Sequence, residues 1–292
     1  MFKHLTLALA SAALLTGTAF ADPTETTVTY TVDGAKVVGT LAVPAGAPAP
    51  VVLLFHGFGG SRDELDIPSV SKGIFAYTAE KLADQGYASL RIDFRGSGDS
   101  DGEFADTTYS SQIADALAAL DFLKSDPSVD ASKIAIIGWS QGGLVASAVA
   151  GRTNVPVATA LWSAVGEPEV TFTNLLGADK IAAGLKTGDT PLELPLPWGF
   201  SLYLTQGDFD QIATTKPLEE IAAYKGPLFV AGGTKDDIIA LGTAEKFVAA
   251  HQGTNELLML PMDHSFNVFT DTKTLDELIA ATEKFFKPYL TK

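Results

Sequence analysis

Hydrophobic and polar positions alternate over two segments near the start of the chain, residues 26–32 and 36–43. An alternation with a period of two is typical of strands that bury one face. Asp33 and Gly34 lie between the two segments, and an Asp-Gly pair favours the tight turn of a β-hairpin. The pattern therefore predicts an N-terminal antiparallel hairpin.

Further along the chain, short and continuous apolar runs replace the alternation. They occupy residues 51–55, 88–92, 133–137, 157–162, 227–230 and 256–260. Stretches with helical periodicity separate them, at residues 74–85, 109–124, 141–150, 241–251 and 275–286. Strands that are apolar on both faces are typical of a parallel sheet covered by helices on each side. The order of the elements predicts an α/β fold with a mostly parallel, doubly wound sheet.

This order of strands and helices stops between about residues 166 and 215. The interval is longer than an ordinary connection. It contains several aromatic residues, namely Phe172, Trp198, Phe200, Tyr203 and Phe209. Because open α/β sheets bind ligands beyond the carboxyl ends of their strands, we expect a cap insertion over that end of the sheet. The alternative is a surface excursion without a role in binding.

The first 21 residues differ from the rest of the chain. Lys3 precedes an apolar run at residues 5–15, and small residues lie just before Asp22. These are the marks of a secretory signal peptide. The run is too short to cross a membrane, which takes roughly 20 apolar residues. We therefore expect cleavage after Ala21, export to the periplasm or the medium, and a single α/β domain over residues 22–292.

Charge and cysteine content narrow the possible functions. The chain has a formal net charge of −15 at pH 7, with 35 Asp and Glu against 20 Lys and Arg. This excess disfavours nucleic acids and anionic membranes as partners, because their phosphates repel negative charge. The absence of cysteine excludes disulfides and thiolate metal sites. We expect a small-molecule substrate and no metal or organic cofactor, and the sequence leaves the oligomeric state open.

The sharpest chemical signal is the pentapeptide at residues 138–142, Gly-Trp-Ser-Gln-Gly. It directly follows the predicted strand at residues 133–137 and opens the predicted helix at residues 141–150. In this position, a Gly-x-Ser-x-Gly turn holds its serine in a strained conformation and exposes the hydroxyl. We predict that Ser140 is a nucleophile; the alternative is a structural turn with an incidental serine.

A serine nucleophile needs a base, and after a turn of this type the acid and then the histidine follow along the chain. Two histidines follow Ser140. His251 ends a predicted helix, where a polar side chain is commonly a terminal group. His264 lies in a loop after a predicted strand, from which its imidazole can reach the serine. We predict that His264 is the general base, against the alternative of a purely structural histidine.

The acid that orients the histidine should follow the predicted strand at residues 227–230. Asp236 and Asp237 both lie in the loop there, and either carboxylate could accept the imidazole N–H. The spacing from Gly233 and the two isoleucines that follow favour Asp236. We expect Asp237 to face solvent.

Several motifs occur in a defined order along the chain. They are residues 56–60 (His-Gly-Phe-Gly-Gly), 93–102 (Asp-Phe-Arg-Gly-Ser-Gly-Asp-Ser-Asp-Gly), 138–142, 233–236 (Gly-Thr-Lys-Asp) and 263–264 (Asp-His). Together they resemble the α/β-hydrolase superfamily, and within it small serine esterases similar to bacterial feruloyl (cinnamoyl) esterases and serine aminopeptidase-like hydrolases. In that fold the loop after an early strand and the residue after the nucleophile stabilise the oxyanion. The resemblance therefore implies that the backbone N–H groups of Phe58 and Gln141 form the oxyanion hole.

These features lead to the expectation of a serine carboxylesterase that works through an acyl-enzyme intermediate. The aromatic residues of the interval at residues 166–215 favour esters with a hydrophobic or aromatic acyl group. An exported peptidase or amidase with the same Ser-Asp-His triad is the alternative. A non-catalytic binding protein on a hydrolase scaffold is a further one, although a binder does not need all of these groups at once.

Overall fold

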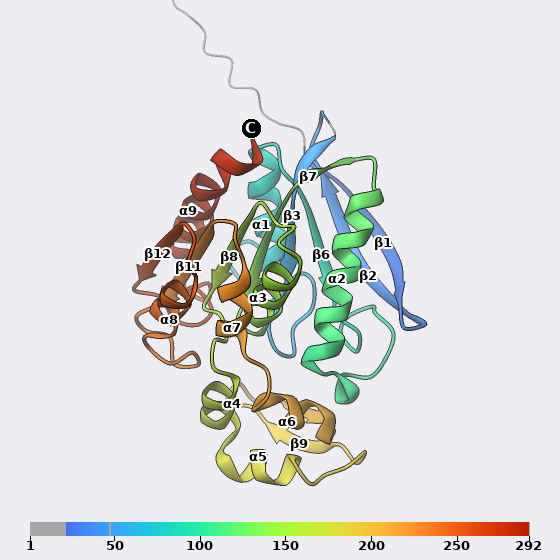
Figure 1. Cartoon of the computed structure of the whole chain (residues 1–292), viewed down its shortest axis with the longest axis vertical. Coiled ribbons are helices and arrows are strands. Elements are labelled where there is room, and N and C mark those ends of the chain that lie inside the picture. Colours follow the sequence, from blue (N-terminus) through green and yellow to red (C-terminus); the bar gives the residue numbers. More distant parts are fainter. Residues whose placement is uncertain (1–21, 47, 292) are drawn as a thin grey trace, which may run out of the picture.

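The computed structural model describes residues 22–46 and 48–291, and its centre is an eight-stranded sheet with the order β1-β2-β6-β3-β7-β8-β11-β12 (Figure 1). The strands are β1 (Thr24–Val32), β2 (Ala35–Val43), β3 (Ala49–Phe55), β6 (Ala88–Asp93), β7 (Val129–Trp139), β8 (Ala158–Trp162), β11 (Leu228–Gly233) and β12 (Asn255–Leu260). Pairing is antiparallel from β1 to β6 and parallel from β6 to β12. The predicted N-terminal hairpin and mostly parallel sheet are confirmed.

Helices cover both faces of this sheet and create two hydrophobic cores. On one face lie α1 (Ile74–Asp84) and α9 (Lys273–Leu290), and on the other α2 (Tyr109–Ser125), α3 (Gln141–Thr153), α7 (Pro217–Ala223) and α8 (Thr243–Ala250). Successive side chains of a strand point to opposite faces. Accordingly, Val51 and Leu53 of β3 belong to the core under α2 and α3, whereas Val52 and Leu54 belong to the core under α1 and α9. Burial on both faces explains the continuous apolar runs of the central strands, whereas the edge strand β12 is partly exposed.

The predicted signal peptide, residues 1–21, lies outside the described residues. Within residues 22–46 and 48–291, no helix has both the length and the apolar character that crossing a membrane requires.

Between β8 and α7 the chain leaves the sheet, and we refer to residues 166–215 as the insertion. Its elements are α4 (Pro168–Leu176), α5 (Ala178–Gly184), β9 (Leu192–Pro195), β10 (Ser201–Leu204) and α6 (Gln206–Ile212). β9 and β10 pair antiparallel as a separate small sheet. Figure 1 shows the insertion as a lobe below the main sheet, reached from the carboxyl end of β8.

The insertion packs on the loops that follow β3 and β6. These loops contain the short elements β4 (Asp66–Ile67), β5 (Lys72–Gly73) and η1 (Phe104–Asp106). The ring of Phe172 in α4 meets the ring of Phe58 edge to face, with centroids 5.3 Å apart. Leu202 in β10 lies against Gly59, because a Cβ added to that glycine would be 2.8 Å from the leucine Cδ1. The lobe therefore rests on the glycine-rich loop at residues 56–60.

Candidate active site

Ser140 lies on the turn between β7 and α3, with φ 54° and ψ −119°. Residues other than glycine rarely adopt these backbone angles, so the backbone of Ser140 is strained. Two glycines make the turn possible. A Cβ on Gly138 would lie 2.3 Å from the carbonyl oxygen of Gly142, and one on Gly142 would lie 2.0 Å from that of Phe55.

The end of β8 holds this strained turn in place. The N–H of Ser140 donates to the carbonyl of Trp162 at 3.0 Å. The carbonyl of Ser140 accepts from the N–H of Gly143 at 3.0 Å and from that of Val165 at 2.9 Å. Ser140 as a whole residue is 7% exposed and is therefore largely buried.

His264 lies in the loop after β12, between the serine and an aspartate. Its Nε2 is 3.0 Å from the Oγ of Ser140, and its Nδ1 is 3.0 Å from the Oδ2 of Asp236. An ionised carboxylate can only accept, so Nδ1 carries the proton and Nε2 is left to accept from the serine hydroxyl. Trp139 steadies the loop, since its indole N–H donates to the carbonyl of His264 at 3.2 Å.

Asp236 lies in the turn after β11, and its carboxylate makes hydrogen bonds on both sides. While Oδ2 faces His264, Oδ1 accepts the N–H groups of Ile238 at 3.0 Å and Ile239 at 2.9 Å. Burial alone raises the pKa of this carboxyl, but the hydrogen bond and charge of His264 and the two N–H groups bring the pKa below its usual value. Asp236 is therefore ionised at neutral pH. The neighbouring Asp237 is exposed, whereas Asp236 is buried.

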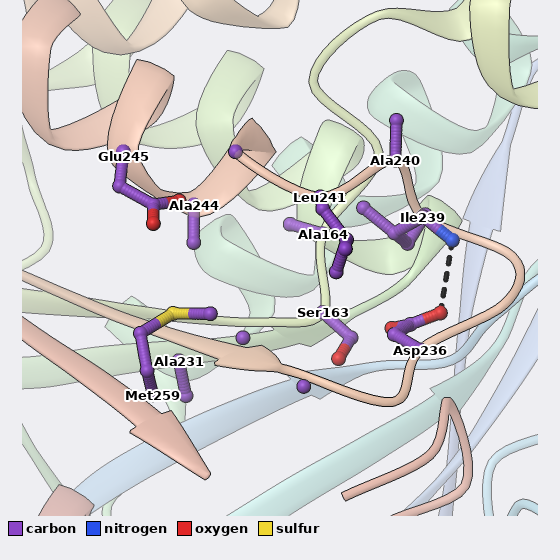
Figure 2. Close-up of a pocket in the computed structure, with 13 residues that line it drawn as sticks. Ser163, Ala164, Ala231, Asp236, Ile239, Ala240, Leu241, Ala244, Glu245 and Met259 are labelled. Carbon is purple, nitrogen blue, oxygen red and sulfur yellow. Dashed lines mark hydrogen bonds between the residues drawn. The ribbon is translucent and has the colours of Figure 1, made fainter. Parts of the chain in front are cut away.

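A small cavity of about 20 Å³ adjoins Asp236 (Figure 2). Ser163, Ile239 and Met259 are among the residues that line it. A space of this size holds about one water molecule and no substrate. The hydroxyl of Ser163 is buried and has no hydrogen-bond partner among the residues described, so the cavity offers a polar site beside the carboxylate.

The glycine-rich loop after β3 passes directly beside the serine. A Cβ on Gly57 would lie 3.4 Å from the Cβ of Ser140. In the described part of the chain, neither the N–H of Phe58 nor that of Gln141 has a hydrogen-bond acceptor. Gln141 opens α3, and the first N–H groups of a helix have no partner within it and form the positive end of its dipole. Both predicted oxyanion donors are therefore available for an anion.

This loop is held by His56 and Glu64, two residues for which the sequence alone predicted no role. His56 is 1% exposed; its Nδ1 contacts the carbonyl of Gly57 at 2.8 Å, and its Nε2 accepts the N–H of Phe94 at 3.2 Å. Burial lowers the pKa of His56 to about 4, so the ring is neutral. Glu64 accepts the N–H of Gly57 from the other side. The sequence offers only the His-Gly dipeptide as a signal for the first residue and nothing periodic for the second.

The remaining histidine after the serine is structural. His251 is 3% exposed, its Nδ1 is 2.6 Å from the Oδ1 of Asn255, and its ring packs on Tyr224. It ends α8, as its position in the sequence predicted, and its side chain is buried. Over residues 22–46 and 48–291, no cluster of three or more His, Cys, Asp or Glu side chains is arranged to hold a metal ion.

A mostly parallel sheet with a strained serine after β7 and an acid and a histidine after β11 and β12 defines an α/β hydrolase. A model of the prolyl oligopeptidase family matches residues 74–292, and the chain belongs to this family.

Several known proteins are similar to it. Acylamino-acid-releasing enzyme 2 of Oryza sativa subsp. japonica is 25% identical over 234 residues, which are 75% of this chain and 28% of that protein. Quorum-quenching protein AidA of Acinetobacter baumannii is 30% identical over 50% of this chain and 49% of its own. The chain spans about a third of the length of the first curated relatives that it matches.

Among solved structures, Est1E from Butyrivibrio proteoclasticus with bound ferulic acid has the same fold. Its TM-score is 0.73 at 24% identity, and the alignment covers 91% of this chain and 100% of Est1E. Dienelactone hydrolase from Anabaena variabilis aligns with a TM-score of 0.63 at 19% identity, over 92% and 100% of the two chains.

Proposed function

We propose that this protein is a serine carboxylesterase. Ser140 Oγ attacks the ester carbonyl carbon while its proton moves to Nε2 of His264, and Asp236 stabilises the imidazolium. The carbonyl oxygen becomes an oxyanion that accepts the N–H groups of Phe58 and Gln141. The C–O bond to the alcohol then breaks, and the alcohol leaves with the proton from His264. A water molecule attacks the acyl-enzyme in the same way, which releases the acid and restores the serine.

The observation that carries this proposal is the continuous hydrogen-bonded series from Ser140 through His264 to Asp236. Both contacts are 3.0 Å long, and the one between Ser140 and His264 lies within the range of about 2.6–3.2 Å that proton transfer requires. The strained backbone of the serine adds support, because strain of this kind persists where function requires it.

We further propose a preference for hydrophobic or aromatic acyl groups. Phe58 supplies a candidate oxyanion N–H, and its ring lies between those of Phe104, at 5.7 Å, and Phe172, at 5.3 Å. Aromatic and apolar side chains therefore adjoin the place where the acyl group is held. The ferulic acid bound to Est1E, a protein of the same fold, is a ligand of this class.

A peptidase or amidase is the second candidate. The family itself and the similarity to an acylamino-acid-releasing enzyme favour it. The same triad would serve, with His264 protonating an amine leaving group in place of an alcohol.

A single panel of substrates tests both candidates. It contains p-nitrophenyl esters of increasing acyl length, methyl ferulate and an aminoacyl p-nitroanilide. We expect turnover of the esters, with kcat/KM highest for the apolar or aromatic acyl groups. Faster turnover of the anilide would make the protein a peptidase, and no turnover of any substrate would favour a binding protein on this scaffold.

We also propose export with cleavage after Ala21, on the basis of residues 1–21 alone. Expression of the full chain in a bacterial host, followed by N-terminal sequencing of the protein from the periplasm and the medium, should give a product that begins at Asp22. A product that keeps Met1 and stays in the cytoplasm would contradict export.

A further inference from the structure

The loop after β3 brings one glycine close to both the candidate nucleophile and a glutamate. A Cβ on Gly57 would lie 3.4 Å from the Cβ of Ser140 and 3.5 Å from Oε1 of Glu64. Gly60 is in close contact with the same carboxylate, since a Cβ there would lie 2.7 Å from Oε1. The missing side chain of Gly60 thus leaves room for the carboxyl group of Glu64, and Gly57 lies within ordinary contact distance of it.

The direction of the Phe58 N–H depends on the carbonyl of Gly57. This carbonyl accepts from Nδ1 of His56 at 2.8 Å and from the N–H of Gly60 at 3.2 Å. Nδ1 is the protonated nitrogen, because Nε2 accepts the N–H of Phe94. A peptide bond is planar and trans, so the N–H of Phe58 points opposite to the Gly57 carbonyl. Holding that carbonyl therefore aims one candidate oxyanion donor.

The contacts of the Gly57 carbonyl fix the peptide plane between Gly57 and Phe58, but not the preceding plane between His56 and Gly57. Glycine has more backbone freedom than any other residue, so one fixed plane does not determine its conformation. The hydrogen bond from the Gly57 N–H to the carboxyl group of Glu64 fixes this preceding plane. On the basis of the proposed esterase function, we propose that Glu64 is a positioning residue that keeps the Phe58 N–H aimed at the oxyanion.

The segment around Glu64 is itself held in a defined place. Its backbone has φ 64°, and its N–H donates to the carbonyl of Ser61 at 3.0 Å. On one side of it, Asp63 pairs with Arg91 of β6 at 2.5 Å. On the other, the N–H of Ile74 in α1 donates to the carbonyl of Leu65 at 3.0 Å. The loop is thus anchored to the sheet and to a helix, and it can act as a rigid support.

The chemistry of this position fits a support better than a charged catalyst. Glu64 is partly exposed as a residue, but the loop encloses its carboxyl group. This burial raises the pKa of Glu64 to about 8, although the N–H groups of Gly57 and Leu65 act to lower it. At pH 7 the group is largely neutral and does not repel a developing oxyanion. Its carbonyl oxygen still accepts the Gly57 N–H, so a glutamine should serve equally well.

Three variants test the proposal: Glu64→Ala, Glu64→Gln and the control Asp66→Ala. Asp66 is exposed and lies in the same loop. Removal of a whole oxyanion donor costs about 10²–10³ in kcat. We expect Glu64→Ala to lower kcat for p-nitrophenyl butyrate about 10- to 100-fold with KM within twofold, since a loosened donor costs less than a lost one. Glu64→Gln and Asp66→Ala should stay within threefold of wild type.

A second measurement does not depend on turnover. A trifluoromethyl ketone adds to the serine hydroxyl and forms an oxyanion, and its dissociation constant can be followed by ¹⁹F NMR. It should rise in Glu64→Ala by the same factor by which kcat falls, with melting curves as the control for folding.

Two outcomes would overturn the role of Glu64: unchanged kcat and ketone binding in Glu64→Ala, or a Glu64→Gln variant as impaired as Glu64→Ala. A wild-type protein that binds the ketone but hydrolyses no ester would instead contradict the esterase proposal, and the ketone would still report on Glu64.

Discussion

The main sheet and the insertion are built in different ways. Every residue of β6 and β8 is buried, and the loops at the carboxyl ends of the strands are tied to them by backbone hydrogen bonds. The insertion consists of short elements; α5 and α6 have seven residues each, a length that is not stable as an isolated helix. It exposes large aromatic side chains, with Trp198, Phe200 and Tyr203 each about half exposed. The candidate triad thus lies on loops tied to the buried sheet, and the side chains that we propose for acyl selection lie partly on the more exposed insertion.

If this division holds, substitutions on the sheet should change rates, and substitutions in the insertion should change selectivity or stability.

The largest effect is expected from Ser140→Ala. The covalent path is lost, and removal of a serine nucleophile has cost about 10⁶ in kcat in a related mechanism. The turn tolerates the small side chain, so folding should be unchanged by circular dichroism. A fluorophosphonate probe should label the wild type and leave the variant unlabelled. A variant that keeps wild-type turnover would remove Ser140 from the mechanism.

Next comes Asp236→Asn, which should leave the imidazole in the wrong tautomer and lower turnover by about 10⁴. The matched control is Asp237→Asn, an exposed neighbour that should stay near wild type. Steady-state turnover of one ester by both variants makes the comparison. A reversed pattern would move the acid to Asp237, and two near-normal variants would place it elsewhere.

A stability effect is expected at the contact between the insertion and the core. Burial raises the pKa of Asp208 in α6 to about 7, so the folded protein keeps this proton up to that pH. The unfolded chain loses it near 3.9. The folded state therefore binds more protons between pH 4 and 7, and stability falls as the pH rises through this window.

Asp208→Asn should remove this part of the pH dependence, which is on the order of a few kcal/mol at about 1.4 kcal/mol per pKa unit. Urea unfolding at pH 4.5 and pH 7.5 measures it. Asp210→Asn, on the same helix but exposed, is the control and should unfold like the wild type at both pH values. Equal pH dependence in all three proteins would mean that Asp208 titrates normally.

The smallest effect is expected from Leu202→Ala, which removes the side chain that lies against Gly59. The ratio of kcat/KM for a long over a short acyl ester should shift about tenfold, the scale of small apolar changes in a pocket. Tyr203→Ala, on the opposite face of β10, is the control and should leave the ratio unchanged. An unchanged ratio in both would separate the insertion from acyl selection.

The two regions also differ in how far the sequence predicts them. The strands of the main sheet lie within a few residues of the predicted segments, and for the central strands the reason is that burial on both faces leaves continuous apolar runs. The turn around Ser140 was predictable because its glycines are sterically required. By contrast, α7 (Pro217–Ala223) was not predicted, since its seven residues are too few for a periodic signal. The fold of the insertion was not predicted either.

The site shows the same contrast. The spacing of Asp236 and His264 after their strands allowed both to be named, and the structure brings them to Ser140. Glu64 could not be named, because its contact with Gly57 depends on a left-handed backbone in an irregular loop.

The hydrogen bonds that Ser140 makes with Trp162 and Val165 have an evolutionary consequence. They come from the last residues before the insertion begins, and no backbone hydrogen bond joins Ser140 to residues 168–212. The backbone contacts that β8 and its loop make with Ser140 therefore end just before the insertion begins, after Val165. A relative with a longer or different lobe could keep these hydrogen bonds of the serine turn unchanged.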